Sequence, residues 1–284
     1  MQIISSQEEL EQLCPKLENE SVIFMDTEFY RRKTYYAKLC LIQIATKEQK
    51  IIIDALPLTN LTPIKNLLLN DKVCKVFHAP DQDFDIFLHL FGHLPNNIFD
   101  TQTAAGVIGL DEVMGYGRLC KALLNVNIDK TMQSADWSER PLNDDLIEYA
   151  IKDVEYLIPL YRELTNTLTG RDLWETYKFR SQKLLDPQNY KIRPEKFIKK
   201  IGLQARSESF KENFSHFIML REECAQNADL PRGYCASDYD LIKICEKLPV
   251  NDKDLVNLQI DRLPIAKKGF KFKLFELCLG IREL

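Results

Sequence analysis

The chain has 284 residues, of which 45% are hydrophobic and 28% are charged, and its formal net charge is −4. This length allows one large domain or two smaller ones, and the composition is that of an ordinary globular protein. No stretch approaches the run of about 18 apolar residues that spans a bilayer, and the N-terminus has neither the basic start nor the apolar segment of a signal peptide. We therefore expect a cytoplasmic protein with no membrane association.

The eight cysteines form no Cys-x-x-Cys pair and lie in apolar, periodic surroundings. This pattern indicates buried free thiols in a reducing compartment and argues against disulfides and against zinc.

The first half of the chain predicts strands followed by alternating helices and strands. Strands are expected at Ser21–Phe29, Leu39–Ala45, Ile51–Asp54, Val73–Phe77 and Ile98–Asp100. Helices are expected at Thr59–Leu69, along a phenylalanine stripe at residues 84–91, at Thr101–Ile108, and from about Asn143 to Leu160. This order predicts an α/β domain with a mixed sheet flanked by helices.

The pattern changes after Gly170, because no strand-like run appears from Arg171 onward and helical spacing dominates. Ser237 and Asp240 have the spacing of a capping box at a helix start. We predict a domain at residues 1–170, a basic helical linker at 171–206 and a small all-helical domain at 207–284.

Positive charge is concentrated in two segments of this acidic chain. The first carries Lys178, Arg180, Lys183, Lys191, Arg193, Lys196, Lys199, Lys200 and Arg206, and the second carries Arg262, Lys267, Lys268, Lys271 and Lys273. Such segments suit a phosphate backbone, although a solvated helix surface explains either one equally well.

Two motifs place carboxylates on apolar faces that carry no cationic residue. Asp26 and Glu28 are two residues apart on a predicted strand, so their side chains point to the same face. Tyr149 and Asp153 are one helical turn apart, on the apolar face of their helix. An unpaired buried carboxylate costs several kcal/mol, so a divalent metal ion is the natural partner.

The middle motif lies between these two and contains Asp81, Asp83 and Asp85. Asp81 suits the N-cap of the following helix, and Asp83 is rotated away from both neighbours, so we predict that Asp83 is the functional one. His78 stands at a strand end, where a hydrogen bond that fixes the turn is expected.

Hard carboxylate ligands favour Mg²⁺ or Mn²⁺, and two such ions can hold the attacking and leaving oxygens of a phosphodiester. The Tyr149 hydroxyl is placed to hold the attacking water together with Glu28; an ordinary core tyrosine is the alternative. Phe29, Tyr35, Tyr36 and Trp137 are candidates for stacking on bases, with packing as the alternative.

These motifs, with others between them, resemble ribonuclease D, a family of DEDD exonucleases in the branch with tyrosine in its third motif. The matching segments are Asp-Thr-Glu-Phe (26–29), Thr-Tyr-Tyr…Leu-Ile-Gln (34–43), His-Ala-x-x-x-Asp (78–83), Phe-Asp-Thr-Gln (99–102), Asp-Trp-Ser-x-Arg-Pro-Leu (136–142) and Tyr-Ala-x-x-Asp-Val-x-Tyr-Leu (149–157). The resemblance covers roughly residues 1–165.

The resemblance implies a ribonuclease H-like exonuclease fold and 3′-to-5′ hydrolysis that releases nucleoside 5′-monophosphates. It places the metal ligands on Asp26, Glu28, Asp83 and Asp153, and the water-orienting tyrosine on Tyr149. The implied substrate is RNA with a free 3′ end, transfer-RNA precursors in particular, and we expect a monomer.

The helical tail from about Ser207 resembles the helicase-and-ribonuclease-D C-terminal (HRDC) module, a nucleic-acid-binding bundle, through Leu-Arg-x-x-x-Ala…Leu-Pro at 220–231. The chain has room for one such module.

Two alternatives stay open. A 3′-5′ DNA exonuclease of the proofreading or Werner type would use the same carboxylates on single-stranded DNA, because the chemistry involves the phosphate and the 3′ end. A non-catalytic RNA-binding scaffold is disfavoured, because none of the expected ligands is missing.

Overall fold

The computed structural model describes residues 1–129, 132 and 135–283. The chain forms two compact units, one made of Met1–Tyr30 and Ala37–Tyr190 and the other of Arg31–Tyr36 and Lys191–Leu284. The domain boundary predicted at residue 170 lies inside the first unit, and the segment predicted as a linker is divided between the two. Within the described residues, no helix is long and apolar enough to cross a membrane.

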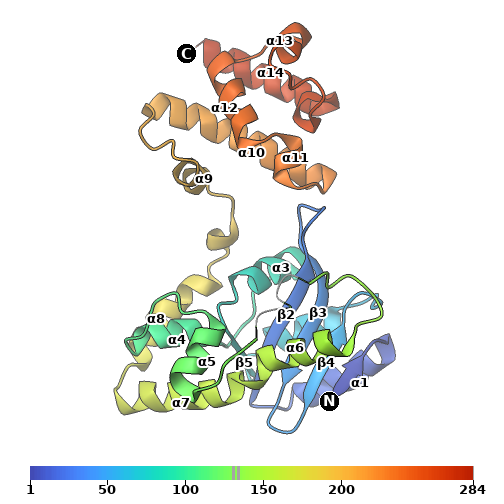
Figure 1. The fold of residues 1–284 in the computed structure, drawn as a ribbon, viewed down its shortest axis with the longest axis vertical. Coiled ribbons are helices and arrows are strands. Elements are labelled where there is room, and N and C mark those ends of the chain that lie inside the picture. The colour runs from blue at the N-terminus through green and yellow to red at the C-terminus, as the bar shows by residue number, and fades with distance from the viewer. Residues whose placement is uncertain (130–131, 133–134, 284) are drawn as a thin grey trace. The chain divides into compact units, whose positions relative to one another are not determined.

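The first unit is built on a six-stranded mixed sheet in the order β1-β4-β3-β2-β5-β6 (Figure 1). The strands are β1 (Gln2–Ile4), β2 (Val22–Tyr30), β3 (Lys38–Ala45), β4 (Lys50–Asp54), β5 (Cys74–Phe77) and β6 (Ile98–Asp100). β2 pairs antiparallel with β3 and parallel with β5, so it lies inside the sheet with a neighbour on each side. The mixed sheet is confirmed, and every predicted strand is present within a residue or two of its expected position.

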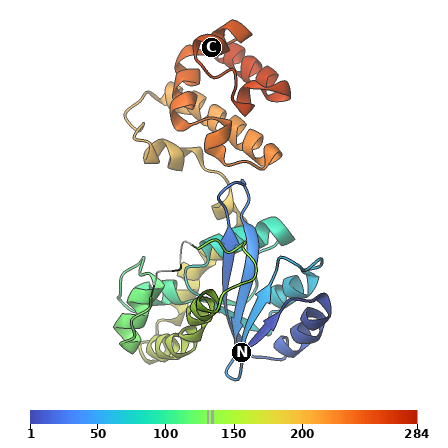
Figure 2. The same cartoon turned by 45° about the vertical axis from the view of Figure 1, so that its right-hand side comes forward.

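Helices cover both faces of this sheet. They are α1 (Gln7–Leu17), α2 (Thr62–Leu69), α3 (Asp81–Phe91), α4 (Thr101–Val107), α5 (Tyr116–Leu124), α6 (Asp144–Glu155), α7 (Leu157–Gly170) and α8 (Trp174–Ser181), followed by two 3₁₀ turns, Gln182–Leu185 and Pro187–Tyr190. In Figure 2 the strands lie between the green helices of one layer and the blue helices of the other.

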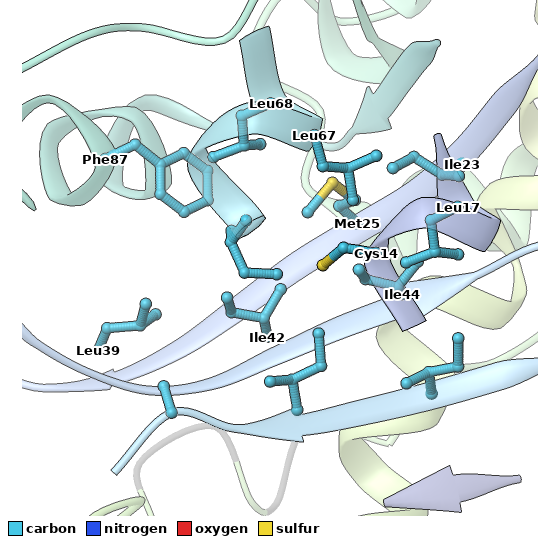
Figure 3. Packing of buried hydrophobic residues seen from close by; sticks show 14 of the residues in the cluster. Cys14, Leu17, Ile23, Met25, Leu39, Ile42, Ile44, Leu67, Leu68 and Phe87 are labelled. Atoms are coloured by element: carbon cyan, nitrogen blue, oxygen red, sulfur yellow. The ribbon is translucent and has the colours of Figure 1, made fainter. Parts of the chain in front are cut away.

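The alternation of side chains along each strand explains the two layers. Ile23 and Met25 of β2 and Ile42 and Ile44 of β3 point to the layer of α1, α2 and α3, where they join one apolar core (Figure 3). The residues between them face the opposite layer, in which α6 packs on β2, β3 and β4. All eight cysteines are free, as expected, and all are buried except Cys74, which was expected to be buried and is partly exposed.

The helix predicted from Asn143 to Leu160 is two helices in the structure. α6 ends at Glu155, and α7 begins at Leu157. Tyr156 lies at the junction with near-helical backbone angles, and for this reason the apolar spacing runs through without a visible break. Leu157 and Leu160 therefore belong to the core around α7 and not to the helix that carries Asp153.

The second unit is helical, as its sequence predicts. Its helices are α9 (Pro194–Lys200), α10 (Glu208–Ala228), α11 (Arg232–Cys235), α12 (Asp238–Lys247), α13 (Asp252–Asn257) and α14 (Lys268–Arg282), with a 3₁₀ turn at Pro264–Ala266. Ser237 and Asp240 form the predicted capping box at the start of α12. The side chain of Lys268, part of the second basic segment, lies outside the described part of the chain.

A short segment from early in the sequence belongs to this second unit. Within Arg31–Tyr36, the Tyr35 hydroxyl donates to Glu222 Oε2 over 2.8 Å, and the Tyr35 backbone N–H donates to Asp229 Oδ1 over 3.0 Å. Tyr35 is 7% exposed, so its ring is part of the core and cannot stack on a base.

Candidate active site

β2 carries the first two acidic residues. Asp26 and Glu28 alternate with Thr27 along the strand, so the two carboxylates face the α6 layer and the threonine faces the other one. The register with β3 shifts between Glu28 and Phe29, which marks a bulge just beyond the second carboxylate. Such bulges often re-aim side chains next to functional sites.

α3 supplies the third carboxylate. Asp83 lies in the first turn of the helix and is 7% exposed. The Thr27 hydroxyl donates a hydrogen bond to Asp83 Oδ1, so the middle residue of the first motif holds the acid of the second. Asp81 does not cap the helix as predicted, because the N-cap is Pro80 and no side chain caps this end.

The turn before α3 depends on a residue of β6. Ala79 adopts a left-handed backbone conformation (φ 53°), and its N–H donates to Asp100 Oδ1 over 2.8 Å. His78 Nδ1 lies 2.8 Å from Thr101 Oγ1, which confirms that this histidine fixes the turn. The Asp100 carboxylate also accepts from the backbone of Gln102 and Thr103 and so caps α4.

α6 supplies the tyrosine and the fourth carboxylate. The helix begins after Asn143, whose side chain accepts the N–H of Leu146. Tyr149 and Asp153 follow on one face, and a hydrogen bond between their side chains opposes the rise in the pKa of Asp153.

All five predicted site residues line one cavity of about 480 Å³, a size typical of ligand sites. Further lining residues are Met25, Thr27, Phe29, His78, Ala79, Gln82, Gln102, Gly115, Tyr116, Gly117, Ile128 and Leu157. No lysine or arginine is among these described lining residues, so the four carboxylates share the cavity without a cationic side chain.

Burial raises the pKa of every carboxyl group in the cavity, and repulsion from the other cavity carboxylates adds to the rise for Asp26 and Glu28. The pKa of Asp26 is raised well above its usual value by burial and by the charges of Asp83, Asp153 and Glu28. Burial raises the pKa of Glu28 to about 9, that of Asp153 to about 7 and that of Asp83 to about 6. The metal-free cavity therefore retains protons near neutral pH, as expected for a carboxylate cluster that lacks a counter-charge.

The residues present fit divalent metal ions. A cation would remove the repulsion among the four carboxylates and would allow them to ionise. In the described part of the chain no three acidic, cysteine or histidine side chains stand in a ligand arrangement.

Tyr116 lines the cavity but was not predicted from the sequence. Its hydroxyl donates to the Lys152 carbonyl over 2.8 Å, one residue before Asp153, and its ring lies 5.5 Å from that of His78. Burial raises its pKa far above the usual value, so it remains a donor. Its position at the start of α5 carries no acidic or periodic signal that sequence reasoning could have used.

Of the residues proposed to stack on bases, Phe29 lines the cavity and Trp137 does not. Trp137 is 2% exposed and packs 6.0 Å from the Tyr149 ring, so it supports the tyrosine from behind.

A comparison with protein families identifies the class of enzyme to which this fold and cavity belong. The family model described as 3′-5′ exonuclease matches residues 1–169, which include every residue that lines the cavity. The chain belongs to the ribonuclease D family of these exonucleases.

The relatives that carry this assignment are bacterial. Ribonuclease D of Sphingobium indicum is 36% identical over 257 residues, which cover 89% of this chain and 66% of that protein. Ribonuclease D of Nitrobacter hamburgensis is 34% identical over 272 residues, 95% of this chain and 70% of that protein. The chain thus spans about two thirds of the length of these curated relatives.

A solved structure resembles almost the whole chain. The crystal structure of Escherichia coli RNase D, described as an exoribonuclease involved in structured RNA processing, has a TM-score of 0.84 at 26% identity. The similarity covers 99% of this chain and 75% of that one.

Proposed function

We propose that the chain is a metal-dependent 3′-5′ exoribonuclease that shortens RNA from a free 3′ end and releases nucleoside 5′-monophosphates. The observation that carries this proposal is the cavity, in which four carboxylates and a tyrosine meet without a lysine or arginine among the described lining residues. The ribonuclease D relatives support the same chemistry.

The proposed ligands of the metal are Asp26, Glu28, Asp83 and Asp153. Their hard oxygens suit Mg²⁺ or Mn²⁺. When bound, a pair of such cations would polarise the phosphate and stabilise the charge on the attacking and leaving oxygens.

Tyr149 is proposed to orient the attacking water. Burial and the charges of Asp153, Glu28 and Asp26 raise the pKa of Tyr149 well above its usual value, so its hydroxyl stays protonated and acts as a donor, not as a base. Glu28, on the facing strand, is the candidate to accept a proton from the water once it is ionised. The water adds to the last phosphorus, the bond from phosphorus to the preceding O3′ breaks, and that oxygen leaves with a proton.

RNA with structured 3′ ends, transfer-RNA precursors in particular, is the proposed substrate, and a monomer is the proposed active form. The helical second unit is proposed to act as an HRDC-like module that binds the RNA backbone. Lys196, Lys199 and Lys200 of α9 are exposed in this unit. Other basic residues are less available, because Arg180, Arg206 and Lys271 form ion pairs with Glu112, Glu246 and Asp252.

The test is a time course on matched RNA and DNA oligonucleotides labelled at the 5′ end, with Mg²⁺, Mn²⁺ or EDTA. The proposal predicts a ladder that shortens from the 3′ end only with metal, and faster for RNA. Faster shortening of DNA would support the DNA exonuclease instead. Binding of both strands without shortening would support the scaffold.

A further inference from the structure

Gln43 of β3 is a buried polar residue with no role in the site described above. Its side chain is fully buried, and neither its amide nitrogen nor its amide oxygen has a hydrogen-bond partner among the described residues. Because both atoms are unpartnered, exchanging the nitrogen and oxygen positions of the amide changes nothing. An amide left in this state costs about 1–3 kcal/mol, so its presence calls for an explanation.

The sheet register places this amide beside the first metal ligand. Gln43 is paired directly with Asp26 across the antiparallel β2–β3 ladder. Directly opposed residues point to the same face, with Cβ atoms about 4.5–5.5 Å apart. The Gln43 side chain therefore lies in the layer between the sheet and α6, next to Asp26 and behind the cavity wall.

The other strand residues on this face offer no partner for an amide. Along β3 the same face carries Leu41 and Ala45, and across the ladder to β4 it carries Ile52. The nearest polar groups on β4 are already engaged, since Asp54 binds Arg140 and Lys50 binds Glu155. Asp26 is the polar group directly opposite.

We propose that Gln43 is a positioning residue for Asp26, with its amide nitrogen donating to the carboxylate oxygen of Asp26 that does not bind metal. The inference rests on the proposed function, because it takes Asp26 to be a ligand. Hydrogen bonds to ligating carboxylates fix their orientation, and loss of such a partner typically costs about 10–100-fold in metal affinity or activity. The unpaired amide lowers the stability of the metal-free protein. This penalty is removed when Asp26 turns toward its ion and accepts the hydrogen bond.

The test replaces the amide by an apolar side chain of the same length, Gln43→Met, and measures Mn²⁺ affinity by isothermal titration calorimetry and Tm in EDTA. We expect Mn²⁺ to bind about 10–100-fold more weakly. Tm in EDTA stays the same or rises, because an unpaired buried amide is removed. Activity lost at low Mn²⁺ returns as the Mn²⁺ concentration is raised, which a purely structural defect would not allow.

The matched control is Ile42→Met, the next residue on β3, which points to the opposite core. It should bind Mn²⁺ as the wild type does. Gln43→Leu serves as a second apolar variant if Gln43→Met fails to fold.

Wild-type Mn²⁺ affinity in Gln43→Met, or in Gln43→Leu where that variant is the one that folds, would overturn the inference. The Asp26→Asn variant separates this failure from failure of the proposed function. If Asp26→Asn loses Mn²⁺ binding while the Gln43 variant keeps it, only the role of Gln43 is wrong. If the wild type itself binds no Mn²⁺, the proposed metal site fails and the role of Gln43 fails with it.

Discussion

Asp26 interacts with every other carboxylate of the cavity, because the charges of all three raise its pKa. We predict that Asp26→Asn lowers the exonuclease rate by roughly a thousandfold or more, the rate equivalent of several kcal/mol of lost charge stabilisation. The fold should persist, because the change removes a charge from a repulsive cluster. The measurement is kcat on a labelled RNA together with Tm in EDTA.

Asp81→Asn is the control for this prediction. Asp81 is exposed and is not among the residues that line the cavity. It should keep a rate close to that of the wild type, and a comparable loss in both variants would contradict the assignment of the site.

The proposal that Tyr149 orients the attacking water can be tested by removing its hydroxyl. Tyr149→Phe keeps the ring against Trp137 and removes the hydroxyl, so kcat should fall by roughly 10²–10⁴-fold. KM for RNA should change much less, because the hydroxyl is proposed to act on the water and not on the RNA. Steady-state kinetics measures both, with Tyr161→Phe on α7 as the control; an unchanged kcat would assign Tyr149 to the core alone.

The raised pKa values predict how stability depends on pH. Glu28 has its usual pKa of 4.5 in the unfolded chain and about 9 in the folded protein, so its favourable contribution is complete below pH 4.5 and is lost as the pH rises toward 9. Without metal, the Glu28→Gln variant should therefore match the wild type in Tm near pH 5 and exceed it near pH 9. Thermal melts in EDTA at several pH values measure this difference.

In the wild type, divalent metal should reverse this loss of stability with rising pH. Mg²⁺ or Mn²⁺ binds the ionised carboxylates, so its stabilising effect should grow as the pH rises. A metal effect that shrinks with rising pH would contradict this arrangement of carboxylates.

The sequence predicted that Asp26, Glu28 and Asp153 share a site because acids inside apolar stretches need a partner, a requirement that holds before folding is known, and the three residues do line one cavity. It could not reveal Tyr116 or the hydrogen bond from Thr27 to Asp83. Thr27 and Asp83 are 56 residues apart, and their hydrogen bond depends on how β2 and α3 meet in three dimensions. Asp81 was misassigned because aspartate favours N-caps, whereas here the chain enters the helix through Pro80.

At the scale of elements, the turn between β5 and α3 determines where Asp83 lies. Asp100→Ala would remove the acceptor of the Ala79 N–H and the cap of α4. We predict a loss of about 1–3 kcal/mol in the free energy of unfolding, since a partly buried donor loses its partner and a helix loses its cap. Chemical denaturation measures it.

Asp111→Ala serves as the control for this change, because Asp111 is exposed and makes only surface contacts, with the Val113 N–H and with Arg118. The Asp111→Ala variant should lose well under half as much free energy of unfolding as Asp100→Ala. An equal cost in the two variants would show that the turn does not depend on Asp100.

Strands and helices with a strong periodic pattern could be predicted from the sequence, whereas short or interrupted ones could not. The strands β2, β3 and β4 follow their β-branched runs closely. β1, only three residues long, and α1, which contains Pro15, gave no comparable signal. The break between α6 and α7 could not be predicted either, since the same apolar spacing continues from one helix into the other.

At the scale of the whole molecule, the second unit is expected to supply RNA affinity rather than chemistry. Replacing Lys196, Lys199 and Lys200 by alanine should weaken binding to long RNA. The slope of log affinity against log salt should become shallower by about 0.7 for each phosphate that the variant no longer neutralises. Cleavage of a short oligonucleotide at saturation should be unchanged. Binding titrations at several salt concentrations measure the slope.

The matched control removes the same charge from exposed lysines of the first unit, Lys16, Lys47 and Lys72. An equal loss of affinity in both triple variants would show that net charge, not the surface of α9, governs binding.

The division into units was only partly predictable. The change to helical spacing after Gly170 predicted a helical second unit, but α8 and the two 3₁₀ turns after it still belong to the first unit. The inclusion of Arg31–Tyr36 in the second unit depends on the hydrogen bond between Tyr35 and Glu222, which are 187 residues apart. No local pattern encodes an interaction of that range.

A crystal structure with Mn²⁺, read from its anomalous difference map, would show directly whether the cavity binds metal. We expect manganese peaks in the cavity, within ligand distance of Asp26, Glu28, Asp83 and Asp153. A well-ordered cavity with no peak at saturating Mn²⁺, or peaks bound only elsewhere, would contradict it.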